Sequence, residues 1–364
     1  MPEPDNETPA ALGYRMPAEW EPHRATWIAW PHNREDWPGK FGPIRWVYAE
    51  IVRHLSRVER VEILVQGAKE EAKARKILAK AGVNPAAVGF HRVRTDRVWT
   101  RDSGPSFVIK DGAVGDERLG LVHWKFNAWA KYDNHLADRK VPRALARILG
   151  ARRWVPKAAV PGIPEPVRIV LEGGAIDVNG RGTVLTTEEC LLSPIQARNP
   201  KLNRSDAEKF LADYLGAHHV IWLGRGIVGD DTHGHVDDLA RFVAPDTVVI
   251  ASEPDPSDEN HEILRENRIR LEAAVDQDGK PLRVVELPMP APVIFDGQRL
   301  PASYANFLIA NGLVLVPTFN DPADREALGI LASLFPDRHV VGIHAVDLVW
   351  GLGTIHCMTQ QEPA

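Results

Sequence analysis

Cys357 is the residue of this sequence best placed for nucleophilic chemistry. It lies in the segment Trp350–Gln361, where two glycines precede it closely and His356 stands directly before it. Glycines let a backbone turn sharply or approach another group, and a cysteine thiolate is a strong nucleophile. A lone cysteine is more often a small buried core residue, but these neighbours favour a nucleophile. Cys190 lacks such neighbours, and we predict that it is structural.

A second motif, His-Gly-His-Val-Asp, spans residues 233–237. In an extended strand, His233, His235 and Asp237 would point to one face. One interpretation is general acid–base catalysis by His235 with Asp237 beside it. A second is a metal site, because imidazole and carboxylate groups on one face are suitable ligands. A third is a solvated polar strand, and the motif alone leaves all three open.

Two further carboxylates stand in distinctive surroundings. Asp102 follows an aromatic residue in Trp99–Pro105, and Glu172 ends an apolar run before two glycines in Leu171–Gly174. Each alone is typical of an ordinary turn. Together with a cysteine and a histidine they indicate a pocket for a cation, because a planar guanidinium pairs with carboxylates through several N–H donors and stacks on aromatic rings.

These residues must be positioned by a chain in which predicted strands and helices alternate. Short apolar runs predict strands over Val61–Val65, Phe107–Ile109, Val248–Ala251, Leu282–Leu287 and Leu313–Val316. Periodicity and capping residues predict helices over Lys69–Ala81, Ser205–Leu215 and Asp321–Phe335, the second capped by Ser205 or Asp206. Such alternation indicates an α/β fold.

Four predicted hairpin turns recur at almost one period. They are Asp111-Gly112, Asn179-Gly180, Pro245-Asp246 and Asn311-Gly312, and their second residues are 66–68 residues apart. Asn-Gly and Asp-Gly between β-rich segments are strong hairpin signals. The spacing predicts repeated strand–hairpin–helix units, about five in 364 residues, and a closed ring rather than an open array; chance is the alternative.

The candidate polar residues occupy similar places in these units. Asp102, Glu172, the pair His235 and Asp237, and Ser303 precede the four turns by 8 to 11 residues. If the units surround a common axis, equivalent strand ends meet there. Carboxylates and imidazoles that are distant in sequence would then share one pocket.

Composition narrows the class of protein. A net charge of −5 gives no sign of a nucleic-acid partner. Two cysteines make a disulfide framework improbable and favour a reducing compartment. The first ten residues lack the pattern of a secretory signal, and no apolar run approaches a membrane span. We therefore expect a cytoplasmic protein without membrane contact, with a flexible tail over 1–12 and a single catalytic domain over 13–364.

The motifs together resemble the agmatine deiminases, within the wider peptidylarginine-deiminase-like group of guanidine-modifying enzymes. The segments that carry the resemblance run in the family's order and cover nearly the whole chain: Met16–His23, Trp99–Pro105, Trp124–Asn134, Glu172–Gly174, Gly234–Asp237 and Ile355–Gln361. The resemblance implies a five-fold pseudo-symmetric α/β propeller of the pentein type with a central active site. It also implies a homodimer and no metal or organic cofactor.

The resemblance assigns roles to single residues. Cys357 would be the nucleophile and His235 the general acid and base, with Glu172 supporting His235. Asp102 and Asp237 would hold the guanidinium. Trp99, Asp231 and Asn306 complete the expected set as substrate-binding residues, with Asp231 a candidate partner for the distal amine of agmatine.

Three departures from the family pattern flank this expected site. Gly351–Thr354 is Gly-Leu-Gly-Thr where Gly-Gly-Gly-Asn is common, His233 replaces a frequent asparagine, and Asp231 replaces a frequent glutamate. We expect hydrolysis of agmatine to N-carbamoylputrescine and ammonia through a covalent thiouronium intermediate. The alternatives are a peptidylarginine deiminase, a metal-dependent hydrolase built on His233, His235 and Asp237, and a protein that binds guanidino compounds without turnover.

Overall fold

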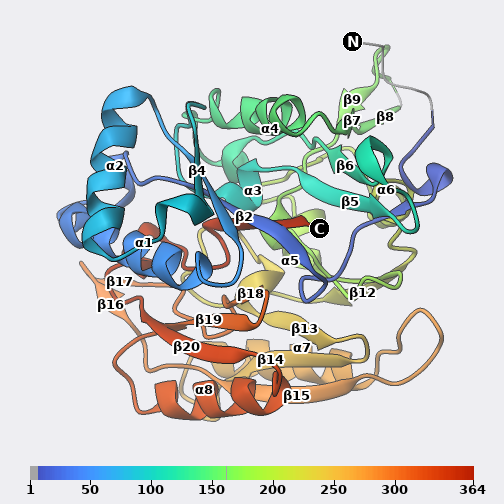
Figure 1. The fold of residues 1–364 in the computed structure, drawn as a ribbon. Coiled ribbons are helices and arrows are strands. Elements are labelled where there is room, and N and C mark those ends of the chain that lie inside the picture. Colours follow the sequence, from blue (N-terminus) through green and yellow to red (C-terminus); the bar gives the residue numbers. More distant parts are fainter. Residues whose placement is uncertain (1–6, 161) are drawn as a thin grey trace.

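The chain folds into a mixed α/β structure in which one local topology recurs. The computed structural model describes residues 7–160 and 162–364. Within these ranges, five sheets each contain an antiparallel strand pair followed by a helix and a strand that returns parallel to the second strand of the pair. Several of the longer helices, α2, α4 and α8, lie towards the outside, and strand ends face the middle of the molecule (Figure 1).

Four of these sheets follow one another along the chain. The first combines β5 (Ser106–Lys110), β6 (Leu119–Val122), α4 (Val141–Leu149) and β7 (Arg152–Trp154), with β1 (Tyr14–Arg15) at its edge. The second combines β10 (Asp177–Val178), β11 (Thr183–Thr187), α6 (Arg204–Leu215) and β12 (His219–Leu223). The third combines β13 (Ala240–Ala244), β14 (Thr247–Ser252), α7 (Asn260–Glu272) and β15 (Arg283–Pro288). The fourth combines β18 (Leu308–Ala310), β19 (Leu313–Thr318), α8 (Ala323–Leu334) and β20 (His339–His344).

The fifth sheet joins the two ends of the chain. It contains β21 (Thr359–Pro363), β2 (His23–Ala29), α1 (Phe41–Leu55), β3 (Arg60–Leu64), α2 (Ala68–Lys80) and β4 (Val88–His91). β21 pairs antiparallel with β2, and Figure 1 shows this red strand beside the blue one near the centre of the molecule. The pairing carries the segment just before β21, which contains Cys357, into the interior.

All four predicted turns join antiparallel strands. Asp111-Gly112 follows β5, and the other three connect β10 to β11, β13 to β14 and β18 to β19. Gly112, Gly180 and Gly312 have φ values of 75°, 72° and 67°, a conformation that strains residues with a Cβ. The predicted repeat therefore has a local physical basis in the turn residues.

The predicted helices are present with small differences at their ends. α2 and α8 begin at Ala68 and Ala323. The predicted cap of α6 was wrong, because Asn203 caps it. The Asn203 side chain accepts from the Asp206 backbone N–H at 3.1 Å, and the Asp206 carboxylate accepts from the Asn203 N–H at 2.9 Å. This reciprocal capping box satisfies two N–H groups at once.

The N-terminal segment contacts the first sheet. Residues 1–6 of the predicted tail lie outside the described residues, Ala10–Leu12 forms a 3-10 turn, and the Glu7 carbonyl accepts from the Trp154 indole at 3.2 Å. The division into a tail and one domain stays a prediction. Over the described ranges, no helix combines the length and the apolar character that a membrane span requires.

Candidate active site

Cys357 lies between the 3-10 turn η9 (Val349–Gly351) and β21, and only 5% of its surface is exposed. Asn306 fixes this segment. Its side-chain oxygen accepts from the Thr354 hydroxyl at 2.7 Å and from the His356 backbone N–H at 3.0 Å. Its side-chain nitrogen donates to the Cys357 sulfur at 3.1 Å. Asn306 was predicted to bind substrate, but its described contacts are with the segment that carries the thiol and with Asp238.

Gly353 packs closely against its neighbours, which leaves little room for a side chain. A Cβ at Gly353 would lie 3.0 Å from the Trp99 ring and 3.2 Å from the Cys357 Cβ. Leu352, by contrast, adopts a φ of 66° although it is not glycine. Such a conformation costs free energy and persists where the surrounding structure enforces it. The Gly-Leu-Gly-Thr departure therefore places a strained leucine beside the nucleophile.

Four predicted polar residues meet in one buried cluster. Asp102 belongs to the short helix α3 (Thr100–Ser103), Glu172 precedes the 3-10 turn η7 (Gly173–Ala175), and His235 and Asp237 lie at η8 (Val236–Asp238). Each of these short helices directly precedes the first strand of a hairpin. The four side chains are at most 3% exposed.

The His235 ring lies among the three carboxylates without a direct hydrogen bond. Its Nδ1 is 3.8 Å from Asp102 Oδ2 and 3.9 Å from Asp237 Oδ1, and its Nε2 is 3.9 Å from Glu172 Oε2. Within the described residues, both ring nitrogens, Glu172 Oε2 and Asp237 Oδ1 are buried without a hydrogen-bond partner. Buried polar atoms are normally paired, so this cluster is arranged for a polar ligand.

Gly174 packs closely against three of these groups. A Cβ there would lie 2.6 Å from His235 Nδ1, 3.0 Å from Asp102 Oδ1 and 3.0 Å from Asp237 Oδ2. The Gly174 N–H also donates to Asp102 at 2.9 Å. The second glycine of the Glu-Gly-Gly motif thus keeps a side chain out of the narrow gap beside His235 and the two carboxylates, which we call the slot.

The carboxylates around the slot favour the protonated form of both His235 and Cys357. Burial alone would lower the pKa of His235, but Asp102 and Glu172 raise it well above its ordinary value. Burial raises the pKa of the Cys357 thiol, and Asp237 and Asp102 raise it further. These surroundings therefore favour a protonated imidazole and a neutral thiol.

Glu172 is ionised because a buried arginine holds it. Burial would raise the pKa of Glu172, but Arg198 and His235 lower it to about 2. Arg198 Nε donates to Glu172 Oε1 at 3.1 Å, and both side chains are fully buried. The sequence analysis did not identify Arg198, because no local pattern marks an arginine that will be buried.

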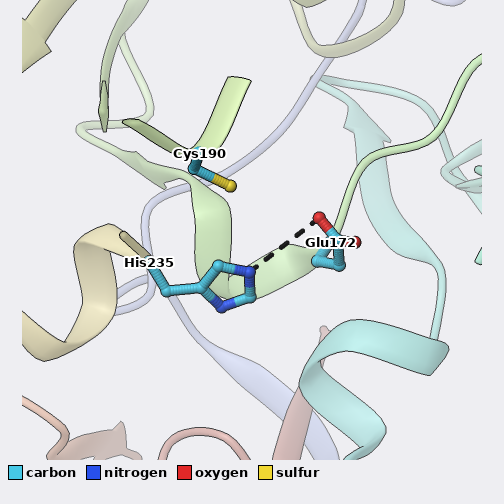
Figure 2. Close-up of side chains that lie close together, drawn as sticks. All are labelled: Glu172, Cys190 and His235. Carbon is cyan, nitrogen blue, oxygen red and sulfur yellow. Dashed lines mark ion pairs between the residues drawn. The ribbon is translucent and has the colours of Figure 1, made fainter. Parts of the chain in front are cut away.

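Cys190 is buried as predicted, but its position is more specific than its sequence suggested. Its sulfur, a Glu172 carboxylate oxygen and a His235 ring nitrogen lie within 4.8 Å of one another (Figure 2). Its backbone N–H donates to the Thr187 hydroxyl at 3.0 Å, which caps α5 (Glu188–Leu192). Cys190 thus lies behind His235, on the Glu172 side of the ring.

The expectation of an extended strand over 233–237 was wrong. His233 and Gly234 have φ values of 65° and 90°, and a 3-10 turn follows. The His233 ring instead faces Ser193 Oγ at 3.0 Å. In the described ranges, the groups whose donor atoms could hold a metal are Glu172 with Cys190 and His235, and Asp237 with Asp238 and Cys357; neither includes His233. The predicted His233–His235–Asp237 ligand set is therefore not assembled.

A narrow cavity of about 30 Å³ lies beside Cys357. It is lined by Arg97, Trp99, Asp102, Trp129, Tyr132, Asp231, Thr232, Gly351, Leu352 and Cys357. Trp99 and Asp231, both predicted to bind substrate, are among these. A cavity of this size holds roughly two water molecules.

The segment before Tyr132 supplies the wall opposite Asp231. Ala128, Trp129 and Ala130 have φ values of 50°, 59° and 54°, which is unusual for three consecutive residues with a Cβ. Trp129 donates its indole N–H to Asp102 at 2.9 Å, and the Tyr132 hydroxyl donates to Asp231 at 2.7 Å.

The mouth of the cavity is less acidic than the sequence suggested. Lys131 forms an ion pair with Asp231, and Arg97 stacks over the Tyr132 ring at 4.2 Å. Arg101, which precedes Asp102 in helix α3, donates to Gln361 at 2.6 Å.

A buried thiol beside a protonated imidazole and several carboxylates defines a cysteine enzyme built for a cationic substrate. A family model described as Porphyromonas-type peptidyl-arginine deiminase matches residues 15–363. An agmatine deiminase of Pseudomonas aeruginosa is 37% identical, with coverage of 98% of this chain and 97% of that protein. The chain belongs to this deiminase family, among the agmatine deiminases, as the sequence motifs predicted.

Solved structures agree with the family assignment. An agmatine deiminase of Enterococcus faecalis has a TM-score of 0.89 and 32% identity, with 100% of this chain and 99% of that chain covered. A C. jejuni agmatine deiminase has a TM-score of 0.80 and 26% identity, with 96% of each chain covered.

Substitution of Gly174 by alanine tests the importance of the open slot. We expect Gly174→Ala to lower kcat/KM by about 100-fold or more, because the new methyl group occupies space between His235 and Asp102. Steady-state kinetics and thermal unfolding measure the two effects. Gly329→Ala in α8 is the matched control, since nothing lies within 4 Å of its Cβ. Wild-type kinetics in Gly174→Ala would contradict the assignment of the slot.

Proposed function

We propose that this protein is an agmatine deiminase that hydrolyses agmatine to N-carbamoylputrescine and ammonia. The observation that carries the proposal is the set of unpartnered buried atoms on His235, Glu172 and Asp237 around the slot at Gly174, with the Cys357 thiol beside it. A planar cation with several N–H donors satisfies carboxylates in such a slot. The agmatine deiminases among the relatives support the choice of substrate.

In the proposed reaction, Asp102 and Asp237 pair with the guanidinium and hold its central carbon near the sulfur of Cys357. The thiolate forms a C–S bond to that carbon, and the C–N bond to the terminal nitrogen breaks. His235 gives its proton to this nitrogen, which leaves as ammonia. The result is a thiouronium attached to Cys357.

The second half of the reaction releases the product. Water enters the place of the ammonia and gives a proton to His235 as its oxygen bonds to the central carbon. The C–S bond then breaks as the oxygen becomes the carbonyl of a ureido group, and the second proton of the water goes to the departing sulfur, so that Cys357 returns to the thiol form. The protonated His235 favoured by these surroundings is the form required for the first step.

Substrate charge offsets the unfavourable surroundings of the thiolate. Burial, Asp237 and Asp102 raise the pKa of Cys357. A guanidinium between the carboxylates and the sulfur introduces a positive charge, which favours the ionised thiol. The thiolate would thus be formed mainly when substrate is present.

The mouth of the cavity bears on the choice between agmatine and peptidyl-arginine. A narrow cavity suits an unbranched alkyl guanidine, and Asp231 is suited to a distal ammonium group. That ammonium would have to replace Lys131, which now pairs with Asp231. The cations Lys131 and Arg97 favour the alternative, a peptidylarginine deiminase, because they could pair with peptide carbonyl groups.

The proposal also covers the arrangement of the sheets, the oligomeric state and the cellular compartment. The five sheets of common topology would be arranged with five-fold pseudo-symmetry around the central site, as the pentein-type resemblance implies. We further propose a homodimer that acts in the cytoplasm on a small-molecule substrate. The two free cysteines suit a reducing compartment.

Replacement of each cysteine tests the covalent mechanism. Cys357→Ala should lower ammonia release by about 1,000-fold or more, since the nucleophile is lost. Cys190→Ala should lose less than about tenfold, since Cys190 forms no bond to substrate in this mechanism. Ammonia assays with thermal unfolding as a folding check measure both. Near-wild-type turnover by Cys357→Ala excludes the mechanism, and an equally deep loss in Cys190→Ala shows that the wrong thiol was assigned.

Treatment with a chelator separates the deiminase from the metal-dependent alternative. We expect activity to survive prolonged incubation with EDTA and the pure protein to contain no stoichiometric metal. The physical reason is that a cysteine nucleophile with a protonated histidine needs no metal-activated water. One zinc ion per chain, with activity lost on its removal, would favour the metal-dependent hydrolase over the cysteine deiminase.

A comparison of substrates tests the proposed preference. Ureido-product formation should be most efficient with agmatine, then with free arginine and a blocked arginine peptide. Asp231→Asn should raise KM for agmatine roughly threefold to tenfold, because a charge pair with the amine is lost. Asp133→Asn is the control, since Asp133 is an exposed carboxylate of the same segment as Tyr132. A higher kcat/KM for the peptide than for agmatine would favour the peptidylarginine alternative.

A further inference from the structure

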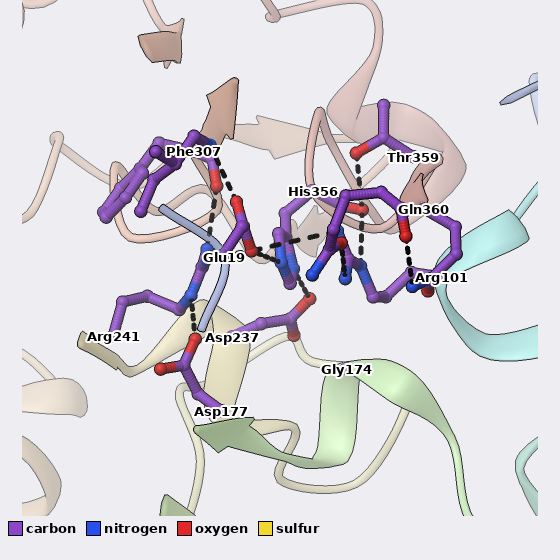
Figure 3. A network of polar contacts seen from close by, with 12 residues as sticks. Glu19, Arg101, Gly174, Asp177, Asp237, Arg241, Phe307, His356, Thr359 and Gln360 are labelled. Atoms are coloured by element: carbon purple, nitrogen blue, oxygen red, sulfur yellow. Dashed lines mark hydrogen bonds and ion pairs between the residues drawn. The ribbon is translucent and has the colours of Figure 1, made fainter. Parts of the chain in front are cut away.

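His356, the residue before the nucleophile, is held between two buried carboxylates. Its Nδ1 is 2.6 Å from Asp237 Oδ2 and its Nε2 is 2.8 Å from Glu19 Oε2. Its side chain is 2% exposed. Figure 3 shows the ring between the two carboxylates, away from Arg241 and next to Arg101. The reaction described above gives this ring no role.

The two contacts define the charge of the ring. An ionised carboxylate can only accept hydrogen bonds, so an imidazole that is bonded to one at each nitrogen must donate from both. Burial would raise the pKa of Glu19, but Arg241 and His356 hold it well below its ordinary value. Burial would also raise the pKa of Asp237, but His356 and His235 lower it. With an ionised carboxylate in contact at each nitrogen, the hydrogen-bond geometry requires both nitrogens of His356 to donate.

Glu19 is a rigid anchor for this ring. Its Oε1 accepts from the Ile309 backbone N–H at 2.7 Å, and its Oε2 accepts from Arg241 at 2.6 Å. Arg241 is fixed in turn by Asp177 at 2.5 Å and by the Phe307 carbonyl at 2.7 Å. Every carboxylate oxygen of Glu19 thus has a partner from a different sheet unit.

The effect on Asp237 is to divide its two oxygens between different tasks. Oδ2 accepts from His356 and lies 3.7 Å from the Cys357 sulfur. Oδ1 has no hydrogen-bond partner in the described part of the chain and faces His235 Nδ1 at 3.9 Å. A rotation of the carboxylate would break the short contact with His356, so Oδ1 stays directed at His235 and Oδ2 stays beside Gly174 and the Cys357 sulfur.

We propose that His356 is a positioning residue that holds the Asp237 carboxylate in the orientation that receives the guanidinium, and that Glu19 acts on the reaction through His356. The proposal rests on the proposed function, in which Asp237 holds the substrate cation. It also gives a role to the Met16–His23 segment, which supplies Glu19 but none of the residues that line the cavity.

The expected pH dependence follows from the groups around Asp237. Those that face it are His356 and Cys357 from the segment before β21, His235 and Asp238 from its own turn, Asp102 from α3, and the guanidinium groups of Arg101 and Arg241. Loss of the His356 charge removes an attraction that lowers the pKa of Asp237. Asp237 would then take up a proton at a higher pH, and the enzyme would lose its grip on a cation as pH falls.

Kinetics of His356→Gln and Glu19→Gln test this role. We expect His356→Gln to lower kcat/KM at neutral pH about tenfold or more, mainly through KM, and to move the acidic limb of the profile upward by about one pH unit. Activity should recover at higher pH, where Asp237 is ionised again. Glu19→Gln should move the limb in the same direction, and the double variant should resemble His356→Gln alone, because the two residues act in series.

His91→Gln is the matched control. His91 of β4 also pairs with a carboxylate, that of Glu62 in β3, at 2.7 Å, but neither residue lines the cavity beside Cys357. Its removal should leave the pH profile unchanged. A loss of activity in His356→Gln that is equal at all pH values and accompanies a lower Tm would show a merely structural role and overturn the proposal. Additive effects of the two single substitutions would also overturn it.

A measurement without substrate separates this proposal from the proposed function. In ¹⁵N-histidine NMR spectra, the signal that disappears in His356→Gln should show two protonated ring nitrogens at pH 7.5. A neutral ring there overturns the role of His356 whatever the enzyme turns over. If the wild-type protein does not act on agmatine, the proposed function fails, while a doubly protonated ring that reverts to a neutral one in Glu19→Gln would still support the coupling between Glu19 and His356.

Discussion

The structure depends on the burial of several carboxylates around one thiol. Removing a carboxylate from water is costly unless it is paired, and Asp102, Glu172 and Asp237 are all at most 3% exposed. Each is held by a different kind of partner. Glu172 has the guanidinium of Arg198, Asp102 has the Trp129 and Gly174 N–H groups, and Asp237 has the His356 ring.

The repeated topology explains how one chain collects these groups. The short helical turns that carry Asp102, Glu172 and Asp237 each precede the first strand of a hairpin. Their equivalent positions bring side chains from separate units to one place. The residues that support these groups are less regularly placed. Glu19, Arg198 and Arg241 come from different positions relative to the turns of their own units. The repeat therefore supplies the groups around the slot, and individual residues supply the hydrogen-bond partners that hold them there.

The sequence predicted the groups around the slot better than the residues that support them. Cys357, Asp102, Glu172 and His235 stand in motifs with glycines and aromatic residues, and local turn chemistry reveals their spacing. The strand expected over 233–237 failed because His233 and Gly234 both have positive φ values and start a turn where alternation suggested a β-strand.

The supporting residues could not be predicted in the same way. Arg198 and Arg241 pair with carboxylates 26 and 64 residues away, and His356 meets Glu19 across 337 residues. Such pairs depend on the assembled fold, and a single sequence contains no local pattern that marks them. The cap at Asn203 was missed for a smaller reason, since two neighbouring residues are also good caps.

The pairing of β2 with β21 has a consequence for biosynthesis. Residues 23–29 emerge from the ribosome early, and their antiparallel partner, residues 359–363, is made more than 300 residues later. During that interval, one edge of β2 has its backbone groups unpaired, and an exposed strand edge can associate with other chains. Contacts of such long separation also slow folding. The nascent chain therefore has to protect an aggregation-prone edge, and its Cys357 can meet the carboxylates only after this sheet closes.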